Sequence, residues 1–306
     1  MTDISDAVDL LLAGVVPERV GEIKAVWSSM QDRVRLQDSH GFVMQQIYGT
    51  IQVNELALKQ IWFIGFACQK AIEAYSGNIV AQQFSGQPCD TSELTTWADR
   101  NGTDLFADRM RLAKELANAE CLEDFDWPND VPYPLEGASY ETINDKAIFD
   151  LVCMAGAYIF LHEISHSLIW QSATTLMSMI SEEVECDKFA LDMMIGCIPK
   201  YSSESGYSKE QVLAKRLLGI IFAKIVILVV TPQSRWKSSS DHPPVANRIR
   251  TILDAADDSI PEDFWLASAA ILVALAEYFR LLNSPVAFTS SRDLAYKMCE
   301  LIGQSD

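Results

Sequence analysis

The chain has 306 residues, of which 49% are hydrophobic, and it carries a formal net charge of −18. This composition is typical of a globular protein with a large buried core, and it argues against disorder over most of the chain. So acidic a surface repels nucleic acid phosphates and anionic lipid head groups, so neither is expected as a main partner. Only 14 glycines and 11 prolines are present, which favours helices over a turn-rich β architecture.

The cysteines and the N-terminal sequence predict a cytoplasmic protein. The seven cysteines are scattered and form no C-x-x-C pair, which argues against a disulfide framework and fits a reducing compartment. The acidic N-terminus lacks the basic segment of a signal peptide. Apolar stretches at 151–161, 217–231 and 264–276 are too short or too interrupted by charge for a span of roughly 20 residues. We interpret them as buried helices, and membrane contact is not expected.

The first part of the chain is predicted to be α-rich, with a short strand. Apolar periodicity predicts helices at 5–37, in two pieces broken near Pro17, at 54–75 and at 104–119. Alternating apolar residues between 42 and 53 indicate a strand, and Asn54 is placed to cap the helix that follows. Residues 76–95 are polar and are predicted to form a loop.

A proline-rich segment at 126–134 is predicted to be an irregular connector. It is either a boundary between an N-terminal α-rich region, 1–125, and a second region, 126–306, or a long loop over the functional site of one continuous domain. The rest of the chain is almost wholly helical in pattern. The predicted helices there are 144–170, 178–196, 208–230, 243–256, 261–282 and 290–302.

Sequence signals mark the ends of two of these helices. Asn144 is the expected N-cap of the first, and Ser208-x-x-Gln211 forms a capping box for the third, which Pro232 ends. The predicted fold class is therefore mainly α (α+β). Its core is expected to be helical, and a small β-sheet is expected in the N-terminal half.

The strongest chemical signal is the H-E-x-x-H sequence at His162-Glu163-Ile164-Ser165-His166, inside the apolar helix 144–170. Residues four apart share one helix face, so both imidazoles point at one spot, as two ligands of a tetrahedral zinc must. Glu163 is then placed to act as general base on a water at the open metal position. The alternative is a polar stripe on a surface helix. Apolar neighbours on both sides favour a buried helix, in which a metal compensates these polar groups.

The third ligand is predicted to come from the following helix. A metzincin needs Gly at 169 and His at 172, and the chain has Ile169 and Ser172. In helix 178–196, Glu183 and Asp187 share a face, 17 and 21 residues after His166. Glu183 is the predicted ligand, and Asp187 is expected to orient a ligating histidine through its free ring N–H.

The alternative for this acidic helix is a solvated face, to which Glu182 and Glu185 are assigned. A short turn at 172–175 would make the two helices antiparallel and return Glu183 to the histidines.

Together these residues resemble a known group of enzymes. The H-E-x-x-H sequence followed by Glu183-Val184-Glu185-Cys186-Asp187-Lys188-Phe189-Ala190 is similar to the gluzincin pattern H-E-x-x-H…E-x-E-A-D-x-x-A of HtpX-like and prenyl-protease-like metallopeptidases, with Cys186 in place of Ala. The segment His242-Pro243-Pro244-Val245-Ala246-Asn247-Arg248-Ile249 resembles their H-P-P-x-x-x-R-I stretch. The resemblance covers about residues 145–255. Length and layout resemble the Lit-type phage-exclusion peptidases, which implies an intracellular protein substrate cleaved during phage defence.

The sequence and this resemblance therefore predict a zinc metallopeptidase with a zincin-like helical core, whose metallopeptidase region is 126–306. One Zn²⁺ per chain is expected, held by His162, His166 and Glu183, with Glu163 as base. The alternative is a latent or degenerate gluzincin scaffold that acts as a binding or sensor protein. His242 is either an electrophilic helper for the oxyanion or a helix-entry residue. Arg248 either pairs with an acidic residue, Asp187 or Glu182, or is exposed.

Overall fold

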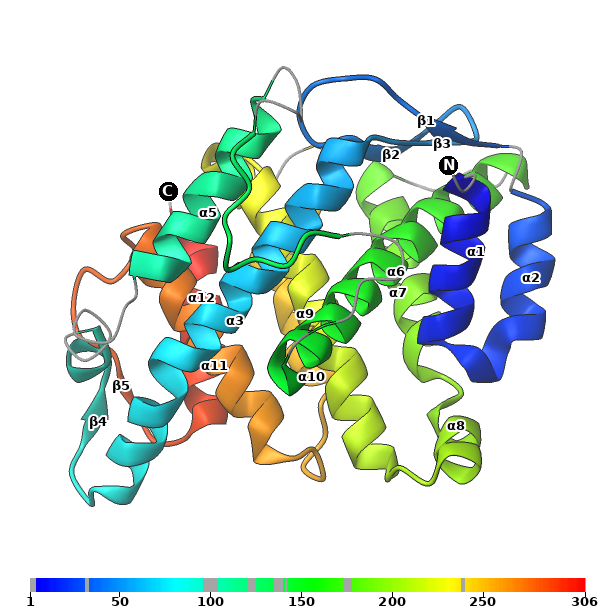
Figure 1. Cartoon of the computed structure of the whole chain (residues 1–306). Helices are drawn as coiled ribbons and strands as arrows, with labels where there is room; N and C mark the ends of the chain where they lie inside the picture. Colours follow the sequence, from blue (N-terminus) through cyan, green and yellow to red (C-terminus); the bar gives the residue numbers. More distant parts are fainter. Residues whose placement is uncertain are drawn as a thin grey trace.

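The computed structural model of the chain describes residues 4–30, 33–95, 104–119, 125–134, 140, 142–172, 178–237 and 240–305. Helices dominate it, and a three-stranded sheet lies across one end of the bundle (Figure 1). The predicted mainly α fold with a small N-terminal sheet is confirmed.

The N-terminal segment forms α1 (Ile4–Val15), a 3-10 turn η1 (Pro17–Arg19) and α2 (Val20–Ser28). Pro17 separates the two helices, as predicted. Beyond α2 the helical prediction to residue 37 was wrong, because Val34–Leu36 forms β1, paired in parallel with a later strand. That pairing satisfies the backbone over a long range, which local periodicity does not reveal.

The region predicted as one strand is a hairpin of β2 (Met44–Ile47) and β3 (Thr50–Val53). Its two turn residues, Tyr48 and Gly49, have φ of 50° and 76°, the combination that a type I′ turn requires. The sheet order is β1-β3-β2, so β2 is an edge strand. A Cβ on Gly49 would lie 2.6 Å from the Trp170 ring, so the turn sits directly on that side chain.

Asn54 caps α3 (Glu55–Phe84), its side chain accepting a hydrogen bond of 2.9 Å from the Ala57 amide, as predicted. The helix continues nine residues beyond the expected end at 75, and the loop predicted for 76–84 was wrong. Ile79 and Gln82, within this extension, are buried, so tertiary packing stabilises a polar helix end. The chain then enters β4 (Cys89–Asp90), which pairs with β5 (Ala287–Phe288).

The remaining helices follow the predicted order closely. They are α5 (Asp104–Ala117), α6 (Ile143–Gln171), α7 (Met179–Ile195), α8 (Ile198–Ser205), α9 (Lys209–Val230), α10 (Val245–Asp254), α11 (Glu262–Tyr278) and α12 (Ser291–Gln304), with the 3-10 turn η4 (Gln233–Arg235) after α9. The Ser208–Gln211 capping box is confirmed. The N-cap of α6 is Thr142 and not Asn144. Helix α8 was not predicted, and the expected turn at 172–175 lies largely outside the described residues.

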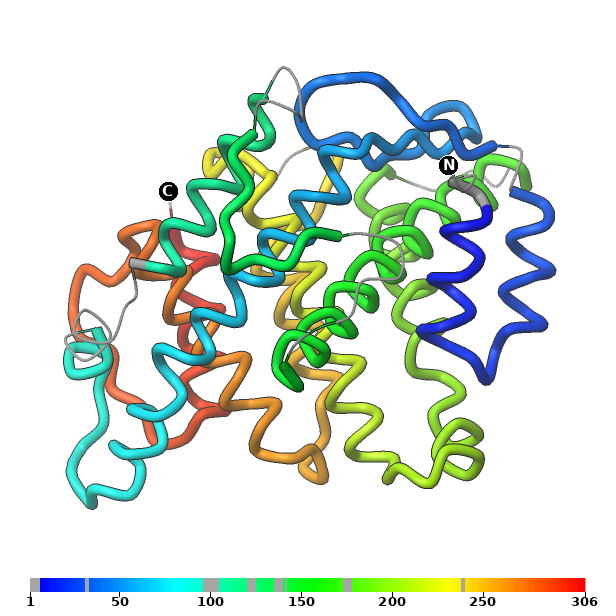
Figure 2. The backbone as a smooth tube through the Cα atoms, viewed as in Figure 1, coloured from blue at the N-terminus to red at the C-terminus, as the bar shows by residue number. Residues whose placement is uncertain are grey.

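Helix α6 is the centre of the bundle and packs against α3, α7 and α9 (Figure 2). Among the described helices it alone is long and apolar enough to cross a membrane, but 67% of that apolar window is buried inside the protein, as in a core helix. One hydrophobic cluster includes residues from both sides of position 125, such as Ile64 and Phe160. The division at residue 125 stays a prediction. The described cysteines are free, and Cys121 lies outside the described residues.

Two glycines of α3 allow a test of its contact with α6. A Cβ on Gly65 would lie 2.2 Å from Val152 Cγ2, whereas one on Gly77 would meet nothing within 4 Å. We expect Gly65→Ala to lower the free energy of unfolding by about 1–3 kcal/mol, because the added methyl overpacks the helix interface. Gly77→Ala should raise it by up to about 1 kcal/mol through helix propensity. Urea denaturation measures both, and equal effects at the two positions would contradict this packing.

Candidate metal centre

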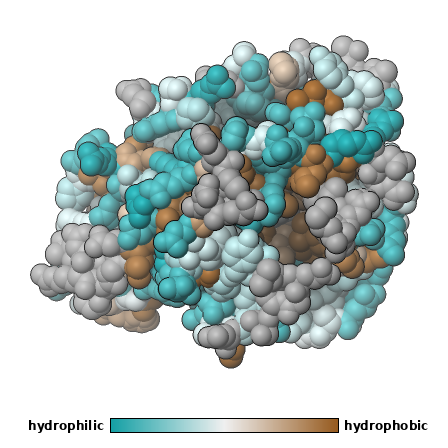
Figure 3. Space-filling view, turned by 45° about the horizontal axis from the view of Figure 1, so that its top comes forward, coloured by the Kyte–Doolittle hydropathy of each residue, from teal (hydrophilic) through white to brown (hydrophobic). Residues whose placement is uncertain are grey.

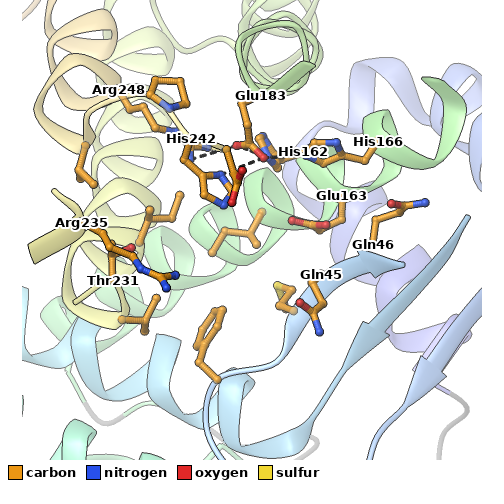
Figure 4. Close-up of a pocket in the computed structure, with 18 of the residues that line it drawn as sticks. Gln45, Gln46, His162, Glu163, His166, Glu183, Thr231, Arg235, His242 and Arg248 are labelled. Carbon is orange, nitrogen blue, oxygen red and sulfur yellow. Dashed lines mark hydrogen bonds and ion pairs between the residues drawn. The ribbon is translucent and has the colours of Figure 1, made fainter. Parts of the chain in front are cut away.

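Helices α6 and α7 bring together the three predicted ligands. One ligand atom from each of His162, His166 and Glu183 lies within 4.8 Å of the others. The two imidazole Nε2 atoms are 3.2 Å apart. Glu183 Oε2 is 3.4 Å from His162 Nε2, and Oε1 is 3.2 Å from His166 Nε2. Figure 4 shows the three side chains converging at one point.

The donor set fits a catalytic metal. Two imidazole nitrogens and one carboxylate oxygen are a ligand set of hydrolytic zinc sites, which leave a fourth position open. In both histidines Nδ1 lies beside a carboxylate, an arrangement that directs Nε2 toward the other ligands. The two Nε2 atoms, 3.2 Å apart, and the Glu183 carboxylate face one point, where a cation could bind.

Asp187 lies where the sequence predicted, outside the ligand set and behind His162. Its Oδ1 is 3.0 Å from His162 Nδ1, although the alignment falls short of a good hydrogen bond. The Arg248 guanidinium donates two hydrogen bonds of 2.7 Å to the same carboxylate, from Nε to Oδ2 and from Nη2 to Oδ1. Of the three alternatives left open for Arg248, the structure selects the pair with Asp187, and Arg248 is buried.

Lys224 of α9 and Tyr158 of α6 also belong to this network, although neither was predicted to be part of the site. The Lys224 Nζ donates to Asp187 Oδ1 and to the Tyr158 hydroxyl, each over 2.8 Å. The Tyr158 hydroxyl in turn donates to Asp187 Oδ1 over 3.1 Å. Burial opposes the charge on Asp187, but Lys224 and Arg248 outweigh it and hold the pKa of that carboxyl well below its ordinary value. The sequence feature that could have revealed this network is a lysine in the middle of an apolar helix, because a buried lysine needs a partner.

The position of Glu182 differs from the one predicted from the sequence. It was placed on the solvated side of α7, yet its Oε1 is 2.7 Å from His166 Nδ1, while Glu185 is exposed as predicted. Burial lowers the pKa of His166, but contacts with Cys186, Glu183 and Glu182 outweigh this and raise it to about 11. Glu182 thus lies beside Nδ1 of His166, as Asp187 lies beside Nδ1 of His162. Cys186 is buried beside the site as an additional contact of the ring.

Glu163 points into the cavity beside the three ligands and is not one of them (Figure 4). Burial raises the pKa of its carboxyl, while His162, His166 and a hydrogen bond from the main chain of Gln46 oppose the rise. A carboxylate of raised basicity next to an open metal position has the properties of a general base.

The loop before α10 brings His242 to the opposite side of the site. Its Nδ1 is 3.1 Å from Glu183 Oε1, and 60% of its side chain is exposed. Arg248 Nη1 lies 3.3 Å from Glu183 Oε2. Hydrogen bonds from His162, His166 and His242 outweigh the burial of Glu183 and hold the pKa of its carboxyl far below the ordinary value. Glu183 is therefore charged and ready to bind a cation.

The site opens into a cavity of about 600 Å³ between α6, β2, the end of α9 and the loop before α10. Much of its lining is apolar: Phe42, Met44, Ile159, Ile227, Val230 and Val245. On the face seen in Figure 3, a hollow with a hydrophobic interior opens among hydrophilic residues. The arrangement is a metal site at one side of an apolar cleft, which suits hydrolysis of a substrate with apolar parts.

The contacts of Asp187 generate a prediction. Asp187→Asn should lower zinc affinity on the order of 10–100-fold, as loss of a group that orients a metal-bound histidine does. It should also destabilise the protein, because Lys224 and Arg248 then share a buried site with one counter-charge fewer. Zinc titration and thermal denaturation measure the two effects, with exposed Glu185→Gln on the same helix as control. Unchanged zinc affinity in the Asn variant would remove Asp187 from the site.

Comparison with known proteins adds to this geometry. The chain matches the model of the Peptidase U49 family over residues 51–268, a span that holds the H-E-x-x-H sequence, Glu183 and His242. No curated protein and no solved structure matches the chain. The match covers more than half of the chain and confirms the resemblance to Lit-type peptidases. The chain therefore belongs to the Peptidase U49 family and is a peptide hydrolase with a metal-binding group of two histidines and a glutamate.

Proposed function

We propose that this peptidase is a zinc endopeptidase acting on an intracellular protein, with Zn²⁺ bound by His162, His166 and Glu183. One observation carries the choice of metal chemistry. Both imidazole Nε2 atoms and a charged carboxylate face one point, and both Nδ1 atoms lie within 3.0 Å of carboxylates. Zinc suits a set of three nitrogen and oxygen ligands with a fourth position open.

The protein's own residues have distinct tasks in hydrolysis. Bound zinc would supply Lewis acidity to the scissile carbonyl and acidity to a water at the open position. Glu163 accepts a proton from that water, for which its raised pKa is suited, and delivers it to the leaving amine. His242, exposed at the mouth of the site, donates a hydrogen bond to the carbonyl oxygen as negative charge develops there.

The edge strand β2 supports a peptide as substrate. The Gln46 main chain hydrogen-bonds to Glu163, so its amide faces the cleft and not β3. Main-chain groups two residues apart on a strand point the same way, so Met44 also presents its backbone to the cleft. An extended peptide laid along this free edge gains main-chain hydrogen bonds, as in other strand-addition complexes. The substrate segment is therefore expected to be extended when it is cut.

The cellular setting belongs to the same proposal. Cleavage of an intracellular protein during defence against phage is supported by the membership in the family of Lit-type peptidases. A cytoplasmic location is supported by the scattered cysteines.

Metal content and activity together test the proposed chemistry. The purified protein should hold about one zinc per chain. His162→Ala, His166→Ala and Glu183→Ala should each lose it, while Glu163→Gln keeps the metal and loses hydrolysis, because the amide cannot accept the proton. Elemental analysis and mass spectrometry of digested protein substrates measure both.

The outcomes separate the proposal from its rivals. If Glu182→Ala lost all zinc while Glu183→Ala kept it, the ligand would be the wrong glutamate. A wild-type protein that holds zinc but cleaves nothing, native or unfolded, would favour the latent or sensor scaffold.

His242 allows a test of the oxyanion role against that of a helix-entry residue. His242→Ala should leave the zinc content intact and lower kcat roughly 100–1,000-fold, as removal of one oxyanion donor does. The melting temperature should change little, because the side chain is 60% exposed. If kcat were unchanged while the melting temperature fell, His242 would serve only the start of α10.

A further inference from the structure

Two guanidinium groups line the cavity, and they differ in how they are paired. Arg248 is buried and neutralised by Asp187 and Glu183. Arg235 is exposed, and its guanidinium makes no hydrogen bond or ion pair within the described part of the chain. Its side chain reaches from η4 into the cavity, toward the side where the metal ligands lie (Figure 4). Arg235 is thus a cation that the described residues leave available to a ligand.

The backbone that carries Arg235 is held firmly. The next residue, Trp236, is buried, and its indole Nε1 donates to the carbonyl oxygens of Leu228 and Thr231 over 3.1 and 3.0 Å. The Trp236 carbonyl accepts a hydrogen bond of 3.0 Å from the Val245 amide at the start of α10. The turn η4 is therefore fixed to both α9 and α10, so the position of the Arg235 backbone does not depend on a loose loop. A pre-positioned donor binds with a smaller entropic penalty.

The acids of the cavity are engaged elsewhere. Glu163 and Glu183 face the metal position, and Glu182 contacts His166. The fourth acid of the lining, Asp241, accepts a hydrogen bond from the Ser240 hydroxyl. Apolar side chains of α9, Ile227 and Val230, line the same wall as Arg235. A guanidinium beside apolar surface binds carboxylates more strongly than one in open water, and its planar fork matches both carboxylate oxygens. The chain carries 42 acidic and 24 basic residues, so an unpaired arginine in a cleft is unusual for this surface.

We propose that Arg235 is a specificity-determining residue that binds a carboxylate of the substrate, from an Asp or Glu side chain at one fixed position relative to the cleaved bond. This inference rests on the proposed function, since it places the peptide in the same cleft. A free C-terminal carboxylate has the same chemistry and would make the enzyme trim chain ends. Because Arg248 is paired with Asp187 and Glu183, acidic preference is expected at the single position that Arg235 reaches.

Cleavage-site profiling tests the inference. The zinc-loaded full-length protein is incubated with a proteome-derived peptide library, prepared once with free and once with amidated C-termini, and cut sites are aligned by mass spectrometry. Wild type should favour Asp and Glu over Asn and Gln at one position by roughly tenfold, the scale of one charge-assisted hydrogen bond. Arg235→Gln should abolish this preference, and Arg235→Glu should replace it with Lys and Arg. Arg250→Gln is the matched control, because Arg250 is exposed on α10, pairs with Glu300 and does not line the cavity.

Each outcome decides a separate question. If preference follows the free C-terminus and disappears with amidated peptides, Arg235 binds the chain end. If wild type, Arg235→Gln and Arg235→Glu share one profile at equal zinc content, the inference is overturned. If wild type cuts no more than Glu163→Gln, the proposed function fails independently. The binding of library peptides is then measured with zinc-loaded Glu163→Gln and with the same variant carrying Arg235→Glu as well. If the second protein no longer retains acidic peptides, the carboxylate site is supported. If both proteins retain the same peptides, the carboxylate site is refuted.

Discussion

The site depends on the contacts of one partly buried carboxylate, that of Asp187. It belongs to α7, and it contacts Lys224 of α9, Arg248 of α10 and both Tyr158 and His162 of α6. Four helices are thus tied to one carboxyl group. With Glu183 included, two carboxylates lie beside Lys224 and Arg248 before any metal binds. A cation bound between His162, His166 and Glu183 would add positive charge next to the Glu163 carboxylate.

Such a network is a poor source of net stability. Each of its ions loses hydration on burial, and apolar residues of equal volume would stabilise a core as well or better. The network instead sets the orientation of side chains. A bidentate arginine and a lysine hold the Asp187 carboxylate in place, and this carboxylate in turn orients the ring of His162. The burial of Lys224 in α9 and Arg248 in α10 therefore costs hydration free energy, and its result is a single orientation for one imidazole in α6.

The sequence was sufficient for the parts of the site that a single helix determines. His162, Glu163 and His166 follow from helical periodicity, and Glu183 and Asp187 follow from the same periodicity one helix later. It was insufficient where partners are distant in the chain. The pair Lys224–Asp187 joins residues 37 apart, and nothing in the apolar pattern of α9 names its partner. The hairpin at 44–53 and the extension of α3 beyond residue 75 depend likewise on neighbours that local pattern does not contain.

The prediction that Glu182 lies on a solvated face was wrong for a different reason. That reason also shows how the surroundings of the two histidines differ. A solvated carboxylate and one that orients a ligand have the same sequence signal, and Glu182 is both: its side chain is 33% exposed while it contacts His166. The corresponding value for Asp187 is 17%, within a network of two cations. His162 is therefore held by the core, and His166 by a carboxylate in contact with solvent and next to the cleft. Because ion pairs in contact with solvent are weaker and more strongly screened by salt than buried ones, the contact at His166 is more sensitive to ionic strength than the contact at His162.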